Sequence, residues 1–404
     1  MIRGLLIAIC AILSIGRAHA DDVLHFGAQP AWVTPIDAPA AKPADGAVTR
    51  RVFDLQVRFD DRGTHQFVRQ ILRVNTPEGL LAAGNVGVAW QPGLSSAMVN
   101  RVVIHRGGET IDVLKDGKGF QILRREKSLE SFMIDGVLTA VMAIPDLRVG
   151  DEVEMAYTID ALNPVLEGHA EAMFPLATPL PIDRLSLRYS WPVGRAMEWK
   201  AGPSAPVGVT TKANGFQTVT FARDGWTSPK AIPGAPARYS NGLVIQLADF
   251  ADWGAVAAVM RPLYAKAATI AQDSPVMTEV KRIAALSTDP VVRASEALRV
   301  VQSQVRYMAR LDGLGGYTPE SADTVWTGKS GDCKGKTVLL LAMLRALGIN
   351  AEPALVSATE GDGLDLSLPL PGRFNHVIVR ATIGGKVYWL DGTRLGDRGI
   401  DTIA

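Results

Sequence analysis

The chain has 404 residues, of which 47% are hydrophobic and 21% are charged, and its formal net charge is +1. This length and composition are typical of a globular protein with two or three domains. A net charge this close to zero gives no reason to expect nucleic acid or an anionic membrane surface as a partner.

Residues 1–20 have the pattern of a secretory signal. Arg3 gives a short basic start, an apolar stretch runs from Leu5 to Ile15, and Ala18-His19-Ala20 precedes Asp21. The apolar stretch is too short for a membrane span, so we expect cleavage after Ala20 and no transmembrane span in the mature chain. The protein is therefore predicted to be exported, and to be periplasmic if the source is a Gram-negative bacterium.

The rest of the N-terminal half is rich in strand signals. Residues 21–47 contain several prolines and predict an extended lead-in, which Trp32 pins to the first domain. Residues 48–224 contain many short β-type runs separated by turn signals, including predicted hairpins over 52–74 and 102–114. This pattern predicts an antiparallel β-sandwich-like domain.

No catalytic, cofactor or metal site is predicted in this β-rich domain. Its histidines, His65, His105 and His169, are isolated and lack the spacing of metal ligands. We therefore expect no metal and no cofactor. The role of the domain stays open.

A stretch rich in proline and glycine, residues 225–242, predicts a linker to a second domain over residues 243–404. Helices are expected from Asp252 and after Pro275 and Pro290, where Ser274 and Asp289 are suitable N-cap residues. Residues 311–317 are rich in glycine and predict a flexible loop. Helices followed by a sheet indicate an α+β domain.

The most informative stretch of the second domain begins at Gly331. Asp332 is a suitable N-cap residue, the run from Thr337 to Leu347 is almost entirely apolar, and Gly348 gives a stop signal. Cys333 would then lie in the first turn of a buried helix, where free N–H groups and the helix dipole favour a thiolate. Cys10 lies in the predicted signal, so Cys333 would be the one cysteine left. The alternative is a small buried hydrophobic residue.

A thiol nucleophile needs a base and an orienting group, and a predicted hairpin over residues 374–393 supplies both. If Gly384-Gly385 forms its loop, Ile383 pairs with Lys386, and the alternation of side chains places His376 and Asp391 on one face as diagonal neighbours. Each residue alone fits a structural reading, His376 as a core histidine and Asp391 as the start of a turn. Together with Cys333 they favour a catalytic set.

These motifs resemble the transglutaminase-like superfamily, a group of papain-like folds. The matching stretches are GDCKGKT (331–337), LLAMLRALGI (340–349), FNHVIV (374–379) and YWLDGT (388–393), with residues 305–326 as the approach segment. The resemblance implies Cys333 as nucleophile, His376 as base and Asp391 as orienting residue. The preceding part is similar to the DUF3857 domain that accompanies this core in exported bacterial proteins.

The sequence departs from relatives at three points. Gly335 stands where relatives often carry Asp, and Gly392 stands where they often carry Pro. The chain also stops soon after Asp391, whereas similar proteins usually continue into a further β-rich region. We therefore expect the C-terminal region to be truncated.

Acyl transfer to a thiol passes through an oxyanion, for which the backbone N–H of Cys333 is a natural donor. Tyr317 and Trp326 are candidates for a second donor or for the wall of the cleft, although both also fit a packing role. Residues 360–373 carry Asp362 and Asp365 among glycines, but they lack the ligand pattern of a calcium loop. They predict a mobile rim of the substrate cleft.

The expected function is an exported thiol enzyme that acts on the amide bonds of a protein or peptide substrate through a Cys-His-Asp triad and a thioester. Transfer to water would make it a peptidase or amidase, and transfer to an amine would make it a transglutaminase. The alternative is a catalytically inactive binding or scaffold protein of the cell envelope. The oligomeric state stays open.

Overall fold

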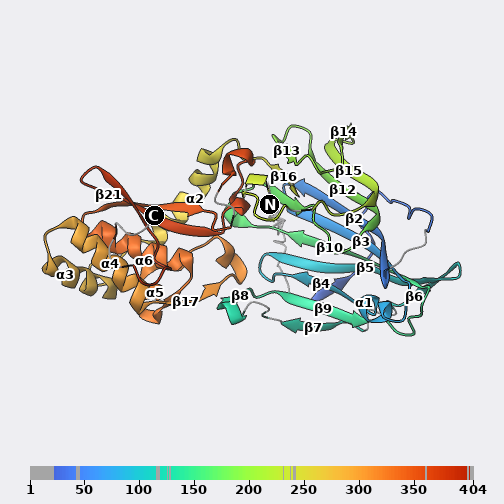
Figure 1. Ribbon diagram of the computed structural model, residues 1–404, viewed down its shortest axis with the longest axis horizontal. Helices are drawn as coiled ribbons and strands as arrows, with labels where there is room; N and C mark the ends of the chain where they lie inside the picture. The colour runs from blue at the N-terminus through green and yellow to red at the C-terminus, as the bar shows by residue number, and fades with distance from the viewer. Residues whose placement is uncertain are drawn as a thin grey trace, which may run out of the picture.

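The computed structural model describes residues 22–41, 46–114, 119–124, 126, 129–230, 232–236, 238–239, 243–359, 362–397 and 400. The predicted signal and Cys10 lie outside the described residues. Figure 1 shows a sheet-rich N-terminal part on the right and an α+β part on the left, in which α3 to α6 gather beside β21. This confirms the predicted fold class.

One large mixed sheet dominates the N-terminal part, with the strand order β1-β5-β10-β3-β2-β12-β15-β14 and with β6 paired to β5. Its strands are β1 (Leu24–Phe26), β2 (Val48–Asp60), β3 (Gly63–Val74), β5 (Ser95–Arg106), β6 (Glu109–Asp112), β10 (Glu152–Ala161), β12 (Ile182–Pro192), β14 (Gly208–Ala213) and β15 (Phe216–Trp226).

Most neighbours in this sheet are antiparallel, and the hairpins β2–β3 and β5–β6 are confirmed. Two pairs are parallel, β1 with β5 and β2 with β12. The expectation of a wholly antiparallel sheet is corrected at these two pairs. Parallel neighbours need long crossover connections, which local sequence patterns do not reveal.

Two three-stranded sheets cover one face of the large sheet and make the part sandwich-like. Along β3, Val68 packs into one apolar core and Leu72 packs against the other, and residues four apart on a strand share a face. The small sheets have the orders β4-β9-β7 and β11-β16-β13. Their strands are β4 (Asn85–Trp90), β7 (Gln121–Arg124), β9 (Leu138–Ala143), β11 (Glu171–Pro175), β13 (Glu198–Ala201) and β16 (Val244–Ala248).

The lead-in segment lies on the sheet, as predicted. Trp32 and Val33 pack with Phe67 and Ala156. The side chain of Gln56 accepts from the N–H of Thr34 at 2.9 Å and donates to its carbonyl oxygen at 2.7 Å. The short strand β1 within this segment was not predicted, because three residues carry too weak a pattern.

The strand after the predicted linker belongs to the N-terminal part. β16 lies between β11 and β13, and its Ile245 and Leu247 are fully buried in the core there. The expectation that the second domain starts at residue 243 is corrected for this strand. A five-residue apolar run fits either domain, and only its long-range partners decide where it belongs.

The α+β part places one buried helix against a three-stranded sheet. The helices are α2 (Trp253–Ala267), α3 (Pro275–Leu286), α4 (Pro290–Gln304), α5 (Ala322–Gly328) and α6 (Cys333–Ala346), and the sheet consists of β20 (Asn350–Val356), β21 (His376–Ile383) and β22 (Lys386–Leu390) in the order β20-β21-β22. Helix α6 packs on β20 and β21, and its residues from Val338 to Leu344 are at most 2% exposed. The predicted N-caps of α3 and α4, Ser274 and Asp289, are confirmed.

Short elements complete the described chain. They are α1 (Gly79–Ala83), β8 (Met133–Ile134), β17 (Arg306–Tyr307), β18 (Ala309–Arg310), β19 (Ser330–Gly331) and the 3-10 turns η2 (Leu129–Ser131), η3 (Pro164–Leu166), η5 (Gly313–Gly316), η6 (Leu364–Leu366) and η7 (Pro371–Arg373). Two of them join the parts of the molecule, because β8 pairs in parallel with β18. Within the described residues, no helix is both long enough and apolar enough to cross a bilayer.

Candidate active site

Cys333 is the first residue of α6, as predicted. The Asp332 side chain caps the helix by accepting from the N–H of Gly335 at 2.8 Å, and the carbonyl oxygen of Asp332 accepts from the N–H of Lys336 at 2.9 Å. The backbone N–H groups of Cys333 and Lys334 precede the first intrahelical bond, so they are free to face an anion at this helix end. Cys333 is a free thiol and is 8% exposed.

The hairpin β21–β22 holds a histidine and a carboxylate side by side. Ile383 pairs with Lys386 and Val379 with Leu390, which confirms the predicted register. His376 begins β21, Asp391 directly follows β22, and His376 Nε2 lies 2.9 Å from Asp391 Oδ2. The other ring nitrogen, Nδ1, is left for the thiol, and Cys333 and His376 line the same cleft and interact electrostatically. The three residues thus form one line, in which Asp391 binds the imidazole and the imidazole lies beside the thiol.

Three further bonds fix this line. The N–H and the hydroxyl of Thr393 donate to Asp391 Oδ1 at 2.8 and 2.7 Å. The amide of Gln302 donates to the carbonyl oxygen of Asp391 at 2.9 Å. Thr393 could have been found from the sequence, since Asp-Gly-Thr is typical of a turn in which the Asp side chain accepts from the backbone two residues on. Gln302 could have been noticed as a polar residue on the apolar side of a helix.

The electrostatics of the line favour a charged imidazole. Its hydrogen bonds to Asp391 and Cys333 raise the pKa of His376 to about 10, although burial opposes this. Burial acts to raise the pKa of Asp391, but hydrogen bonds from His376 and Thr393 outweigh it and lower that pKa. A protonated His376 beside the sulfur therefore stabilises negative charge there.

The two lysines of the first turn are committed elsewhere. The Lys334 ammonium forms an ion pair with Asp332. The Lys336 ammonium donates to the carbonyl oxygen of Val305 at 2.5 Å, and burial lowers its pKa to about 8. His376 is consequently the cation that faces the thiol most directly.

A cleft of about 410 Å³ opens at Cys333 and His376. Its wall is largely apolar and aromatic; apart from His376, its charged members are Asp332 and Lys334, which pair with each other. The wall comes from both parts of the chain and includes Met133, Met260, Tyr264, Tyr307, Leu311 and Phe374. Met133 and Tyr264 were not predicted, because they are distant from Cys333 along the chain. Tyr307 lies within the approach segment but was not singled out there.

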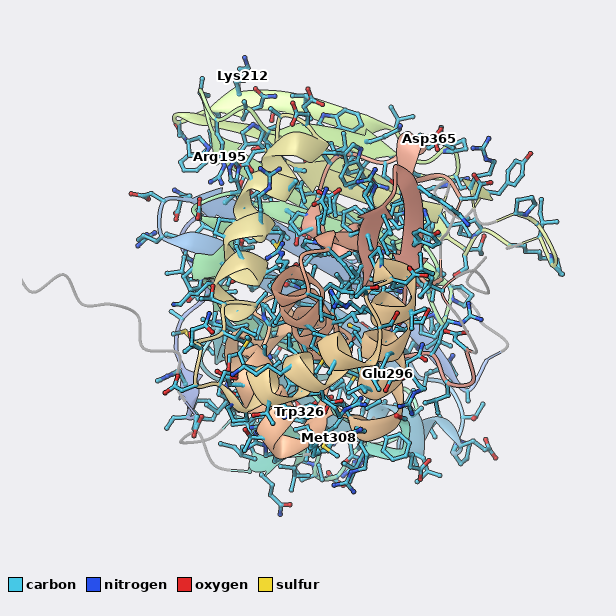
Figure 2. All side chains as sticks on the ribbon, turned by 90° about the vertical axis from the view of Figure 1, so that its left-hand side faces the viewer. Arg195, Lys212, Glu296, Met308, Trp326 and Asp365 are labelled. Atoms are coloured by element: carbon cyan, nitrogen blue, oxygen red, sulfur yellow. The ribbon has the colours of Figure 1, made fainter. Side chains whose placement is uncertain are left out.

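The two aromatic candidates take different positions. Tyr317 lines the cleft, and its hydroxyl donates to Glu171 Oε1 at 2.7 Å. Trp326 is not among the described side chains that line the cleft. It lies on α5, packs against the core, and has Lys329 Nζ 2.9 Å from its ring centroid. Figure 2 shows Trp326 and Met308 in the lower half of the end-on view. Of the two candidates, the structure brings only Tyr317 to the cleft.

The described residues contain no group of three or more His, Cys, Asp or Glu side chains that could hold a metal ion. The isolated histidines lie beside carboxylates, His65 beside Asp160 at 2.6 Å and His105 beside Glu154 at 2.7 Å. His169 lies 3.0 Å from Asp249 and stacks on Phe250. These contacts give the three histidines structural roles. Arg238 likewise pairs with Asp362 on the predicted rim, part of which lies outside the described residues.

Comparisons with known proteins agree with this architecture. Residues 60–225 match the model of DUF3857, a domain of unknown function with solved structures, and residues 278–388 match the model of the transglutaminase-like superfamily. No curated protein matches the chain.

Among solved structures, one described as a "putative protease" from Parabacteroides distasonis is similar over 88% of this chain and 69% of that chain, with a TM-score of 0.65 and 16% identity. This likeness shows a shared fold. A "putative cysteine protease" from Cytophaga hutchinsonii matches with 14% identity over 56% of this chain and 75% of that chain, and its TM-score is 0.23. An M1 zinc metallopeptidase from Deinococcus radiodurans matches with 12% identity over 50% of this chain and 42% of that chain, and its TM-score is 0.27. TM-scores this low do not establish a shared fold.

Proposed function

Because a transglutaminase-like domain follows a DUF3857 domain in this chain, we propose that the protein is a thiol enzyme that cleaves or transfers amide bonds. The observation that carries the proposal is the line of Asp391, His376 and Cys333, in which Asp391 binds His376 at 2.9 Å and His376 and Cys333 line one cleft at a helix N-terminus. The fold neighbour from Parabacteroides distasonis is described as a "putative protease", which is consistent with this class.

In the proposed reaction, the Cys333 sulfur attacks the carbonyl carbon of a substrate amide. The negative charge moves to the carbonyl oxygen, which the free N–H groups at the start of α6 can stabilise. His376 then gives its proton to the leaving nitrogen, the C–N bond breaks, and a thioester remains on Cys333. Asp391 holds the imidazole in place and stabilises its charge through both changes of protonation.

The second half of the reaction resolves the thioester. A water molecule or a primary amine loses a proton to His376 and attacks the thioester carbon, which releases the thiolate. Water gives a peptidase or amidase, and an amine gives a transglutaminase. Hydrolysis is our first expectation, because the described cleft wall has no unpaired carboxylate that would bind an incoming ammonium group.

The substrate class follows from the wall of the cleft. Methionine, tyrosine, leucine and phenylalanine side chains surround the thiol, and a charged substrate group would lose its hydration there without a partner. We therefore propose a protein or peptide substrate with an uncharged, apolar residue next to the scissile bond.

The first test is the pH dependence of Cys333 alkylation by iodoacetamide, followed by a screen of peptides with and without added amine. Fast labelling near pH 6 that His376→Ala abolishes, together with turnover that Cys333→Ala abolishes, would support the proposal. Slow labelling that is identical in the wild type and in His376→Ala would instead favour the inactive binding protein. The amine arm separates transfer from hydrolysis.

We also propose export, on the basis of the signal pattern in residues 1–20. Expression in a Gram-negative host, with N-terminal sequencing of the periplasmic fraction, tests this proposal. A mature chain that starts at Asp21 is the expected result. An uncleaved chain found only in the cytosol would contradict it.

A further inference from the structure

One wall of the cleft is the loop at residues 309–317, and the N-terminal domain binds the first residues of this loop. Ala309 and Leu311 line the cleft, and their N–H groups donate to the carbonyl oxygens of Phe132 and Ile134, each at 2.8 Å. The Gln91 side chain also donates to the carbonyl oxygen of Leu311. The N-terminal domain adds Met133, between these two contacts, to the wall itself.

Glu171 holds the same loop at its other end. The Tyr317 hydroxyl donates to Glu171 Oε1 at 2.7 Å, and the N–H of Gly372 donates to Oε2 at 2.9 Å. Tyr317 ends the loop, and Pro371, next to Gly372, lies on a separate segment that also lines the cleft. One carboxyl group from β11 therefore ties together two segments of the cleft rim.

Glu171 lies in a half-buried position that disfavours its charged form. Burial raises its pKa, although the hydrogen bonds from Gly372 and Tyr317 act to lower it. Among the ion pairs of the described residues, none joins Glu171 to a basic side chain. A half-buried carboxyl group without a cation contributes little to the stability of a fold, so its two rim contacts account better for its presence.

We propose that the N-terminal domain forms part of the substrate-binding site and that Glu171 is the positioning residue through which it sets the shape of the cleft. The inference rests on the proposed function in that the cleft is taken as the substrate site. It gives the N-terminal domain a role in substrate binding, because that domain binds both ends of the loop at residues 309–317.

The test compares Glu171→Ala, Glu171→Gln and Tyr317→Phe with the control Glu198→Ala. Glu198 pairs with the same residue of β16, Ala248, from the opposite side and is exposed. We expect Glu171→Ala to lower kcat/KM for a peptide substrate at least tenfold, mainly by raising KM. Glu171→Gln should fall between Glu171→Ala and the wild type. The double variant Glu171→Ala/Tyr317→Phe should lose little more kcat/KM than Glu171→Ala alone.

Iodoacetamide labelling shows whether the catalytic line is intact, because the reagent is too small to need the rim. Its rate should stay within about twofold of wild type in every variant. Unchanged KM with unchanged labelling would overturn the inference while leaving the proposed function standing.

Hydrogen exchange keeps the inference testable if no peptide is turned over. Glu171→Ala should speed exchange at the amides of residues 309–318 and 372–374 and leave exchange in α6 unchanged. The control Glu198→Ala should not change exchange in any of these segments. Turnover that is absent even in the wild type would count against the proposed function. Unchanged exchange in these two segments would overturn the inference whatever the activity.

Discussion

The Thr337 hydroxyl donates to the carbonyl oxygen of Val377 at 3.0 Å, and this buried bond ties the helix that carries Cys333 to the strand that carries His376. Thr337 lies one turn after Cys333 on α6, and Val377 directly follows His376 on β21. The bond therefore holds the proposed nucleophile and base at a fixed distance without taking part in the reaction.

Thr337→Val should loosen this connection, because the methyl group that replaces the hydroxyl cannot donate. We expect a loss of about 1–2 kcal/mol in the free energy of unfolding and a several-fold slower alkylation of Cys333 at pH 6. Thr337→Ser keeps the donor and serves as the control. Equal labelling rates in all three proteins would contradict the role of this bond.

Asp391→Asn should weaken the base more than the fold. The amide keeps the size of the side chain but removes the negative charge that holds the pKa of His376 at about 10. The pKa of His376 should therefore fall, Cys333 labelling near pH 6 should slow, and turnover should fall by about tenfold or more. Thr393→Val, which removes one support of Asp391, should act in the same direction by less.

His376 should make stability depend on pH. Its folded pKa of about 10 lies above the ordinary value of 6.5, so its contribution is complete below pH 6.5 and is lost as the pH rises through 10. Urea titrations of wild type should show the unfolding free energy falling across this window by roughly 1–3 kcal/mol. The His376→Ala protein should show a smaller fall. The same slope in both proteins would rule out His376 as its source.

Gly335 is required by close packing in the first turn of α6. A Cβ atom there would lie 2.8 Å from Val325 Cγ2, so a larger residue would require Val325 to move. We expect Gly335→Ala to cost about 1–3 kcal/mol through overpacking. In the Val325→Ala protein, Gly335→Ala should lower the free energy of unfolding only slightly. A double-mutant cycle measures the difference between the two costs.

Met133→Glu should change which peptides the enzyme accepts. A carboxylate in the apolar wall would disfavour apolar substrate residues, and turnover of such peptides should drop by about tenfold while peptides with lysine at that position gain. Met133→Leu keeps the wall apolar and is the control. Identical selectivity in both variants would show that Met133 does not contact the substrate.

Local signals predicted the core of the candidate site well. The cap at Asp332, the stop at Gly348 and the register about Gly384-Gly385 depend on short stretches of chain, so the positions of Cys333, His376 and Asp391 followed from them. The contacts that distant segments make with the site could not be predicted from such local signals. Met133 lines the cleft and Glu171 binds its rim through strand pairings that no local pattern encodes, and the parallel pairing of β2 with β12 was missed for the same reason. Trp326 was a candidate by proximity in sequence, but α5 directs it to Lys329 instead.

The placement of β16 bears on how such two-domain proteins can be recombined in evolution. Ile245 and Leu247 are fully buried in the N-terminal core, yet the helix that follows contributes Met260 and Tyr264 to the cleft. If two genes recombined within the proline-rich stretch at residues 225–242, β16 of one protein would have to pair with β11 and β13 of the other. A functional exchange of N-terminal domains would instead keep residues 244–248 with their own N-terminal domain and place the junction just before α2.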